Sequence, residues 1–414
     1  MAATAIGPRT AVAVRAGRMA GALSRKVGLG AGAIIAGRVA LRLDGQALSR
    51  LATGRRVVLV SGTNGKTTTS HMIAAALRTA APVAHNDTGA NMPDGALAAL
   101  MEQPDAPLAV IEVDELHLGA VADAVHPAAV VLLNLSRDQL DRGTEVHAVA
   151  RSLSAALRRH PDTLVVANAD DPVVVGAVQP SHRVVWVAAG MSWLADAGGC
   201  PGCGRRLETG VGPWRCTNCG MTRPTPTWGL DEGAVRHPGG RTEVRLTLPG
   251  RFNLGNAAFA MAAADALGVP PDAAATAIAG LGSIAGRYGV HRRGPHELRL
   301  MLAKNPAGWA ETLPLLADAR AVLLVVNARE ADGRDTSWLW DVPFEQLPDG
   351  ATVAVAGERA ADVGLRLSYA DVSHATEPDP LAALALLPPG QVQVVANYTA
   401  FLSIRRRLAT EEAA

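Results

Sequence analysis

The segment at residues 57–70, VVLVSGTNGKTTTS, has the residue types of a phosphate-binding loop between a strand and a helix. Gly62 and Gly65 let the backbone curl, so that successive N–H groups point at phosphate oxygens. Lys66 offers an ammonium group to the β- and γ-phosphates, and Thr67 offers a hydroxyl to Mg²⁺ at the positive end of a helix. The loop predicts ATP and Mg²⁺ as ligands, with nucleotide contacts from Gly62, Thr63, Asn64, Gly65, Lys66, Thr67 and Thr68.

Two CxxC pairs, CPGC at 200–203 and CTNC at 216–219, contain every cysteine of the chain. This spacing is typical of a Cys₄ zinc ribbon, in which four thiolates fill a tetrahedral Zn²⁺ shell and leave no open position for water. We therefore expect a structural zinc site rather than a catalytic one. The ligands would be Cys200, Cys203, Cys216 and Cys219.

Composition narrows the class of protein. The 414 residues carry 39 Lys and Arg against 38 Asp and Glu, so there is no basic excess of the kind that marks a nucleic-acid-binding protein. Cysteines grouped for a metal indicate a reducing compartment, and the longest apolar run near the N-terminus is too short to span a bilayer. The sequence thus predicts a cytoplasmic protein that does not bind nucleic acid.

Short apolar runs that alternate with Ala-rich helical stretches predict an α/β fold with parallel sheets covered on both faces. Strands are expected at 57–60, 108–113, 129–135, 163–169, 298–303, 321–327, 352–357 and 392–397. The Gly- and Arg-rich segment 282–294 is expected to be a linker. The expected domains are a basic helical segment at 1–50, a central ATP-binding domain at 51–285 with the zinc-ribbon insert at 198–224, and a smaller α/β domain at 290–414.

The N-terminal 50 residues contain eight Arg or Lys and one acid, Asp44. Helical spacing at 11–24 leaves two interpretations open. The favoured one is a solvated helix packed on the main body. The other is a basic amphipathic face that rests on an anionic membrane, which would give the protein a peripheral position at the inner face of the plasma membrane.

Several segments, in order along most of the chain, resemble one branch of the Mur ligase family, the MurT-type synthetase subunits of lipid II isoglutaminyl synthase. The loop GTNGKT is the shortened form typical of Mur ligases and their folate-ligase relatives. The other segments are HNDTGANM (85–92), VIEVDE (110–115), NLSRDQLDR (134–142), NADDP (168–172), GRFNLGNAAFA (250–260), AKNPAG (303–308), ADGRDTSWLWD (331–341) and ANYT (396–399).

The resemblance implies roles for further residues. Glu112, at the end of an apolar strand, matches the glutamate that binds Mg²⁺, and Asn256 matches an asparagine that faces the nucleotide. Arg287 and Asn305 resemble nucleotide contacts of the wider family. Asp335 matches an acid that joins a Cys–His pair in a partner glutaminase of the GatD type. The proposed catalytic residues are therefore Lys66, Glu112 and Asp335.

The implied reaction is ATP-dependent amidation of the α-carboxyl of D-glutamate in the lipid II stem peptide, through an acyl phosphate. Glutamine hydrolysis normally uses a cysteine thiolate, and all four cysteines here are assigned to metal, so ammonia must come from a separate subunit. A Mur ligase or folylpolyglutamate synthase-like enzyme that adds an amino acid is the alternative, and a non-catalytic nucleotide-binding scaffold is a third. Three departures speak against amino-acid addition: few residues precede the loop, DQLD (138–141) replaces DHLD, and LAKNP (302–306) replaces DYAHNP.

Overall fold

The computed structural model describes residues 7–27, 32–87, 89–137, 145–191, 193, 195–209, 212–281 and 288–412. The described residues form two compact units. Unit 1 draws on 1–135, 146–247 and 251–285, and unit 2 on 136–145, 248–250 and 286–414. The segments of DQLD (138–141) and Arg287 lie outside the described residues.

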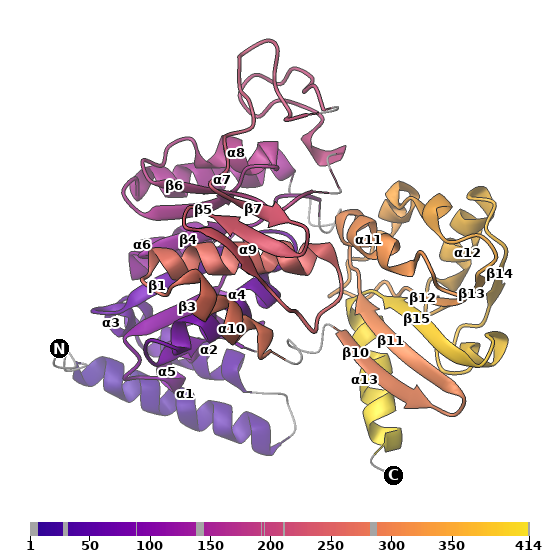
Figure 1. The fold of residues 1–414 in the computed structure, drawn as a ribbon. Helices are drawn as coiled ribbons and strands as arrows, with labels where there is room; N and C mark the ends of the chain where they lie inside the picture. Colours follow the sequence, from indigo (N-terminus) through magenta and orange to yellow (C-terminus); the bar gives the residue numbers. More distant parts are fainter. Residues whose placement is uncertain are drawn as a thin grey trace. The chain divides into compact units, whose positions relative to one another are not determined.

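Unit 1 is built on a nine-stranded sheet in the order β2-β3-β1-β4-β5-β6-β7-β8-β9 (Figure 1). The first seven strands of this order are parallel, and β8 and β9 are antiparallel additions at one edge. The strands are β1 (Arg56–Ser61), β2 (Val83–His85), β3 (Leu108–Glu112), β4 (Ala129–Leu132), β5 (Leu164–Asn168), β6 (Val184–Ala188), β7 (Trp228–Asp231), β8 (Ala234–His237) and β9 (Gly240–Glu243).

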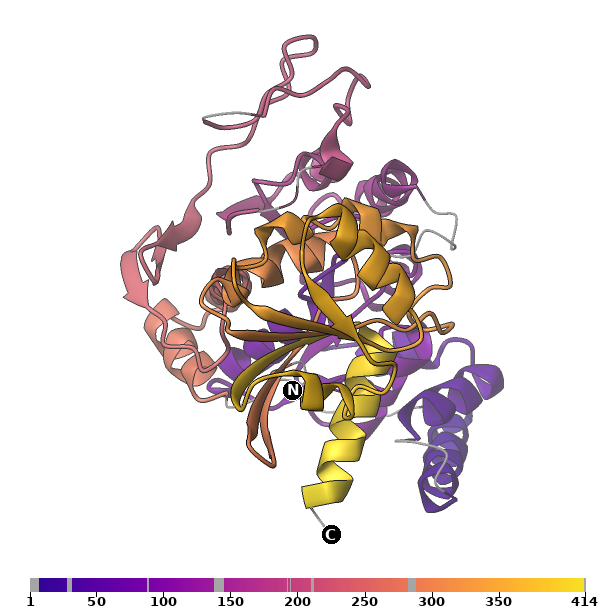
Figure 2. The same ribbon diagram turned by 90° about the vertical axis from the view of Figure 1, so that its right-hand side faces the viewer.

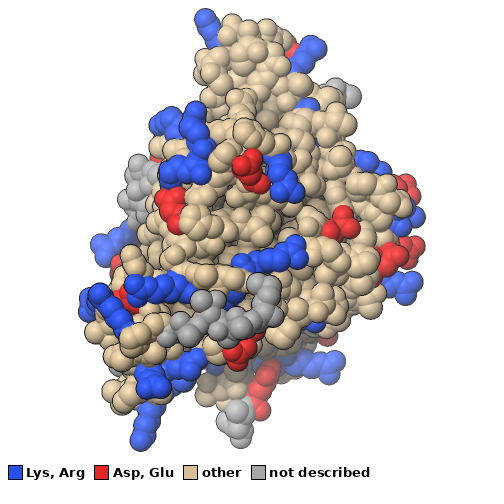
Figure 3. Space-filling view, turned by 90° about the vertical axis from the view of Figure 1, so that its left-hand side faces the viewer, with Lys and Arg blue, Asp and Glu red and all other residues tan. Residues whose placement is uncertain are grey.

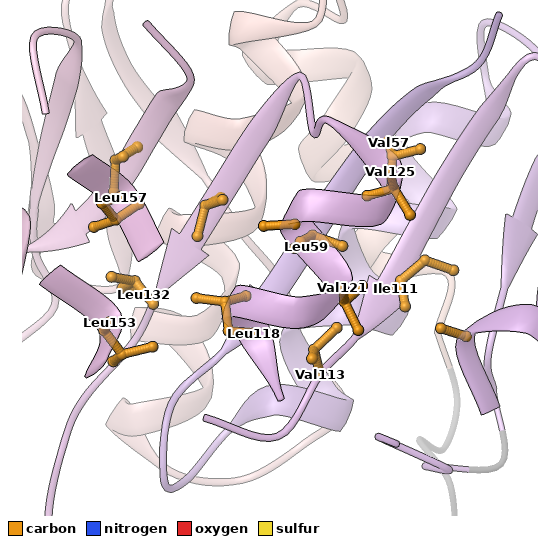
Figure 4. Packing of buried hydrophobic residues seen from close by; sticks show 14 of the residues in the cluster. Val57, Leu59, Ile111, Val113, Leu118, Val121, Val125, Leu132, Leu153 and Leu157 are labelled. Atoms are coloured by element: carbon orange, nitrogen blue, oxygen red, sulfur yellow. The ribbon is translucent and has the colours of Figure 1, made fainter. Parts of the chain in front are cut away.

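Helices cover both faces of this sheet, as near-continuous apolar strands require. One layer holds α4 (Lys66–Arg78), α9 (Arg251–Ala266) and α10 (Pro271–Ala279). The other holds α3 (Ala47–Ala52), α5 (Pro93–Glu102), α6 (Leu118–Val125), α7 (Val146–Arg159) and α8 (Pro172–Val178). Figure 4 shows the core of this second layer, where Leu59 and Ile111 of the sheet meet Leu118 and Val121 of α6.

The N-terminal segment forms two helices, α1 (Pro8–Lys26) and α2 (Ala33–Leu43), which lie side by side in Figures 1 and 2. Small residues allow this close packing. A Cβ on Gly17 would lie 2.5 Å from the Ala36 carbonyl oxygen, and one on Gly37 would lie 1.8 Å from that of Asp94 at the start of α5. None of the described helices is long and apolar enough to cross a membrane.

Unit 2 has a six-stranded sheet in the order β10-β11-β15-β12-β13-β14, parallel except for β10 against β11. Its strands are β10 (Tyr288–Arg293), β11 (His296–Leu302), β12 (Ala321–Val325), β13 (Thr352–Ala356), β14 (His374–Thr376) and β15 (Gly390–Ala396). Its α-helices are α11 (Pro306–Thr312), α12 (Ala360–Tyr369) and α13 (Tyr398–Glu412), with the 3₁₀ turns η3 (Leu313–Leu316), η4 (Ser337–Asp341), η5 (Phe344–Gln346) and η6 (Ala383–Leu386).

The prediction of a linker over 282–294 is wrong for its second half. Residues Tyr288–Arg293, YGVHRR, form β10, whose side chains are alternately half-buried and exposed along part of the strand. β10 is the edge strand of its sheet, and charged residues are common on such strands because they discourage pairing with other chains. The arginines therefore mark a sheet edge here rather than an unstructured connection.

Candidate nucleotide and metal sites

The predicted phosphate loop joins β1 to α4 at the centre of the unit 1 sheet, with β3 on one side of β1 and β4 on the other. From β1 the chain first forms β2 and β3 on one side of this strand and then crosses to β4 on the other side. Ligands of open α/β sheets bind beyond the carboxyl ends of the strands at such a switch point. Gly62 and Gly65 have φ values of 137° and 85°, which favour glycine. A Cβ on Gly65 would lie 2.7 Å from Oδ1 of Asn256 in α9. The structure thus brings Asn256 directly against the loop.

Lys66 is buried at the first position of α4. Its Nζ donates to the carbonyl oxygen of Gly62, which curls the loop over the ammonium group. The same Nζ lies 3.3 Å from a carboxylate oxygen of Glu115, which is also mostly buried. A buried ammonium needs a charged partner, and Glu115 provides it here. A nucleotide phosphate would offer the same group a second set of negative oxygens.

Thr67 and Glu112 are brought together by the neighbouring strands β1 and β3. The Thr67 hydroxyl donates a hydrogen bond of 2.8 Å to a carboxylate oxygen of Glu112, whose residue is only 2% exposed. Asn86 fixes the backbone of Glu112, because its amide exchanges two hydrogen bonds of 2.8 Å with the N–H and carbonyl of that residue. A hydroxyl and a carboxylate are hard oxygen ligands, and this pair fits Mg²⁺ beside the phosphates.

Two histidines lie near Thr67 and Glu112. The rings of His71 on α4 and His85 at the end of β2 meet edge to face at 4.5 Å, and His85 lies 3.1 Å from the Ser70 hydroxyl. Burial, then the charges of His71 and Arg78, lowers the pKa of His85 to about 3. Burial also lowers the pKa of His71. Both rings are therefore neutral near pH 7 and add no positive charge to the proposed cation site.

Three residues of this site were not singled out in the sequence. Asn134 follows β4; its side chain accepts from the Asn64 N–H at 2.9 Å and donates to the Asn64 carbonyl at 3.1 Å, so it holds the phosphate loop in shape. Glu115 and Asn86 are the other two. Each lies just beyond the carboxyl end of a parallel strand, a position that could have identified them as candidates.

The four cysteine sulfurs, which come from the segment between β6 and β7, all lie within 4.8 Å of one another, and the cysteines form no disulfide. The Sγ atoms of Cys200 and Cys219 are 3.5 Å apart, as are those of Cys203 and Cys216. Tetrahedral zinc with Zn–S bonds of about 2.3 Å separates sulfurs by about 3.8 Å. The spacing of the four thiols therefore fits a closed tetrahedral metal site.

The cysteine segment projects from unit 1 as a loop-rich arm in Figures 1 and 2. Two contacts anchor it to the NADDP segment (168–172). Arg223 pairs with Asp170 at 2.6 Å, and the buried indole N–H of Trp214 donates to the Ala169 carbonyl at 3.2 Å. Asp171 of the same segment accepts from the N–H of Leu135, just past β4. The NADDP motif thus connects the cysteine arm to the strand ends around the phosphate loop.

Asp335 and Asn305 belong to unit 2. Asp335 is exposed before η4 and accepts a 2.8 Å hydrogen bond from the Ser337 N–H, which holds the pKa of this carboxyl below its ordinary value. Asn305 is fully buried and caps α11 by accepting from the Gly308 N–H at 2.9 Å. That bond gives Asn305 a structural role in its own unit.

A buried polar network supports the loop that carries Asp335. Asp332 accepts from both the N–H and the hydroxyl of Thr399, which lies at the start of α13. Asn397 and Asn327 are joined by two hydrogen bonds, of 3.0 and 2.7 Å, across the ends of β15 and β12. The ADGRD and ANYT motifs, far apart in sequence, therefore form one structure that presents Asp335 to solvent.

Comparisons with known proteins identify two domains of the chain and its family. Residues 60–191 match the Mur ligase middle domain, and residues 302–401 match the MurT ligase C-terminal domain. A Staphylococcus aureus protein named lipid II isoglutaminyl synthase (glutamine-hydrolyzing) subunit MurT is 31% identical over 87% of this chain and 88% of its own. The subunit of the same name from Streptococcus pneumoniae is 29% identical over 93% of this chain and 94% of its own.

Solved structures support the same fold. A pseudomurein peptide ligase type C from Methanothermus fervidus superposes with a TM-score of 0.70, at 19% identity, over 86% of this chain and 79% of its own. Folylpolyglutamate synthase from Mycobacterium tuberculosis gives 0.60, at 16% identity, over 96% of this chain and 99% of its own. On the sequence comparisons and the shared fold, the chain belongs to the MurT subunits of lipid II isoglutaminyl synthase, a branch of the Mur ligase family.

Proposed function

We propose that this chain is the ATP-dependent synthetase subunit that amidates the α-carboxyl of D-glutamate in the lipid II stem peptide, giving D-isoglutamine. The names of its relatives support the reaction, and Mur ligases use ATP and Mg²⁺. The single observation that carries the proposal is the combination of Lys66, Thr67 and Glu112 around one phosphate loop. The enzyme works at the cytoplasmic side of the membrane, where a lipid-linked precursor is accessible.

The chemistry follows from the loop. A carboxylate oxygen of the substrate attacks the γ-phosphorus of ATP, and ADP leaves. Lys66 and the N–H groups of the loop neutralise charge that develops on the phosphoryl oxygens, and Mg²⁺ held by Thr67 and Glu112 would add to this stabilisation. Ammonia then attacks the acyl carbon, phosphate leaves with the former carboxylate oxygen, and the nitrogen loses a proton. The product is a primary amide.

The remaining site residues have proposed supporting roles. Asn256, Thr63, Asn64 and Thr68 line or adjoin the loop and would contact the nucleotide, while Arg287 and Asn305 stay predictions from the resemblance alone. Zn²⁺ is the ion that we propose for the four cysteines, where it would stabilise the arm without taking part in the reaction.

Ammonia would come from a glutaminase of the GatD type. Among the described residues the cysteines lie together in the arm, so the nucleophile for glutamine hydrolysis must belong to another chain. Asp335 is exposed, and its lowered pKa keeps it ionised, which suits a carboxylate that orients a partner histidine. The buried network behind its loop would hold that orientation.

The test is reconstitution with a candidate glutaminase and lipid II, with either glutamine or ammonium chloride as the nitrogen source. We expect Lys66→Ala to abolish amidation from both sources. Asp335→Asn should abolish the glutamine-driven reaction and leave the ammonia-driven one intact. Asp349→Asn, at another exposed position of unit 2, is the matched control and should resemble the wild type. Undiminished glutaminase activity with Asp335→Asn would remove the role given to this residue.

A further inference from the structure

The outward face of α1 presents an apolar line to solvent. Val12, Met19 and Leu23 recur at helical spacing along it and are 62%, 73% and 63% exposed. Among the described residues, six of the fourteen exposed large hydrophobic side chains lie between positions 12 and 43: those three with Val27, Ile34 and Leu43. Solvent exposure of this much apolar surface on one short segment indicates a binding face.

The charged residues of the segment that carries this line all have one sign. Residues 1–43 contain seven Arg or Lys and no Asp or Glu, although acids and bases balance over the whole chain. On α1, Arg15 and Lys26 are exposed and flank the apolar line at helical spacing. Figure 3 shows several Lys and Arg side chains toward the lower left of the face that it views, with a few Asp or Glu side chains among them. An apolar line bordered by cations is complementary to an anionic lipid surface.

The opposite face of α1 fixes the helix to unit 1. Gly17 and Gly21 lie so close to α2 that added Cβ atoms would be 2.5 and 2.9 Å from backbone oxygens. Thr10 donates to the buried Asp44 carboxylate at 2.6 Å, and Arg18 donates to the Met101 carbonyl at the end of α5. The outward face is therefore part of a rigid surface rather than of a free tail.

The helix α2 is connected to the proposed catalytic site through the start of α5. Gly37 of α2 presses on Asp94 at the start of α5, and Arg38 pairs with the Asp94 carboxylate at 3.4 Å. Gly89, which precedes α5, lies at the phosphate site, because a Cβ on it would be 3.8 Å from the Thr67 hydroxyl. A surface that α1 rests on would therefore lie close to the chemistry within unit 1.

We infer that the outward face of α1 docks this protein on a membrane leaflet rich in anionic phospholipid, with Val12, Met19 and Leu23 inserted among the headgroups and Arg15 and Lys26 against their phosphates. The inference rests on the proposed function only in giving the docking a purpose, since a lipid-linked substrate is met at that surface. Docking itself is a property of α1 and is measured without any substrate.

The test is sedimentation of the full-length protein with vesicles of phosphatidylcholine alone or with 40% phosphatidylglycerol. We expect binding to the anionic vesicles that weakens as salt is raised. Removing each cation should weaken binding about fivefold, so Arg15→Gln with Lys26→Gln should cost at least tenfold. Val12→Ser, Met19→Ser and Leu23→Ser together should weaken binding by a similar factor. Val290→Ser, at an exposed valine of unit 2, is the apolar control.

A melting curve for each variant separates loss of binding from loss of folding. Equal vesicle binding by the wild type and the folded triple-serine variant would overturn the inference, as would no binding to anionic vesicles. A change in self-association or in glutaminase affinity without vesicle binding would assign the face to a protein instead. With lipid II as substrate, the triple variant should lose amidation in vesicles but keep it in detergent. Failure of the wild type in both settings would refute the proposed function and leave the binding result standing.

Discussion

The hydrogen bond between Thr67 and Glu112 is the most informative contact of the site. It joins the first turn of α4 to the end of β3, and both side chains are buried. A carboxylate is not normally kept in such a place without a cation or a strong donor. The Thr67 hydroxyl and the Glu112 carboxylate would supply two of the oxygen ligands that Mg²⁺ prefers.

Glu112→Gln tests this interpretation. The amide can still hydrogen-bond to Thr67, so the fold should be kept, but the negative charge that attracts Mg²⁺ is lost. We expect the Mg²⁺ concentration for half-maximal activity to rise at least about tenfold. A Mg²⁺ titration of ATP-dependent amidation measures this, with the exposed Glu102→Gln as the control. An unchanged Mg²⁺ requirement would show that Glu112 does not bind the metal.

We expect the buried His85 to make the stability of the folded protein sensitive to acid. Its pKa is about 3 in the folded protein against an ordinary value of 6.5. Below pH 6.5 His85 becomes protonated in the unfolded chain, whereas in the folded chain it becomes protonated only near pH 3. The stability contributed by neutral His85 is therefore complete above pH 6.5 and is lost progressively as pH falls toward 3. The loss between pH 7 and pH 5 is about 2 kcal/mol.

Urea unfolding of the wild type and of His85→Gln at the two pH values measures this contribution. The variant should be less stable at pH 7, but it should lose about 2 kcal/mol less than the wild type on acidification. The exposed His182→Gln serves as the control. Parallel losses in the wild type and His85→Gln would mean that His85 is not the acid-sensitive group.

Among the elements, those with uniform burial were predicted well from sequence. Runs such as VVLV (57–60) and AVLLVVN (321–327) are buried on both faces, so their apolar character is continuous and identifies β1 and β12. The strands β7, β8 and β9, which form an antiparallel meander, and the edge strand β10 were not predicted. These strands are short, or charged on one face, because only part of each is covered. Composition does not distinguish such strands from loops.

The site shows the same division. The phosphate loop and the cysteine arm are local in sequence, so spacing alone was enough to propose their residues as candidates. Asn134 and Glu115 reach the loop only because β3 and β4 flank β1, and that strand order is not written in any local pattern. Likewise, Asp332 and Thr399 are 67 positions apart, and only the parallel sheet of unit 2 brings them together.

The cysteine arm gives a prediction at the element scale. We propose that a metal holds its two CxxC turns together, in addition to the packing of its buried residues on unit 1. We expect one Zn²⁺ per chain by elemental analysis, and Cys203→Ser should lose it. Because the Trp214 indole is buried against Ala169, loss of the metal should also shift its fluorescence to longer wavelength. Wild-type protein purified without metal, or Cys203→Ser with a full equivalent of zinc, would contradict the site.

At the scale of the whole molecule, the described residues contain a candidate phosphate site, and every cysteine of the chain lies in the proposed metal cluster. Lys66, Thr67, Glu112 and Asn256 surround one loop in unit 1, while unit 2 presents Asp335 on a braced, exposed loop. This division is expected of a synthetase that performs the activation itself and depends on a second protein for its nitrogen. The proposed function therefore depends on the phosphorylation of the substrate carboxylate by ATP.

The most direct measurement follows an oxygen atom of the substrate carboxylate into the released phosphate. Lipid II carrying ¹⁸O in the α-carboxyl of its D-glutamate would be amidated with ATP and ammonium chloride, and the released phosphate analysed by mass spectrometry. An acyl phosphate requires one ¹⁸O atom in inorganic phosphate for each amide formed, and Lys66→Ala should give neither labelled phosphate nor amide. Amide formed with unlabelled phosphate, or with ¹⁸O in AMP, would contradict the account.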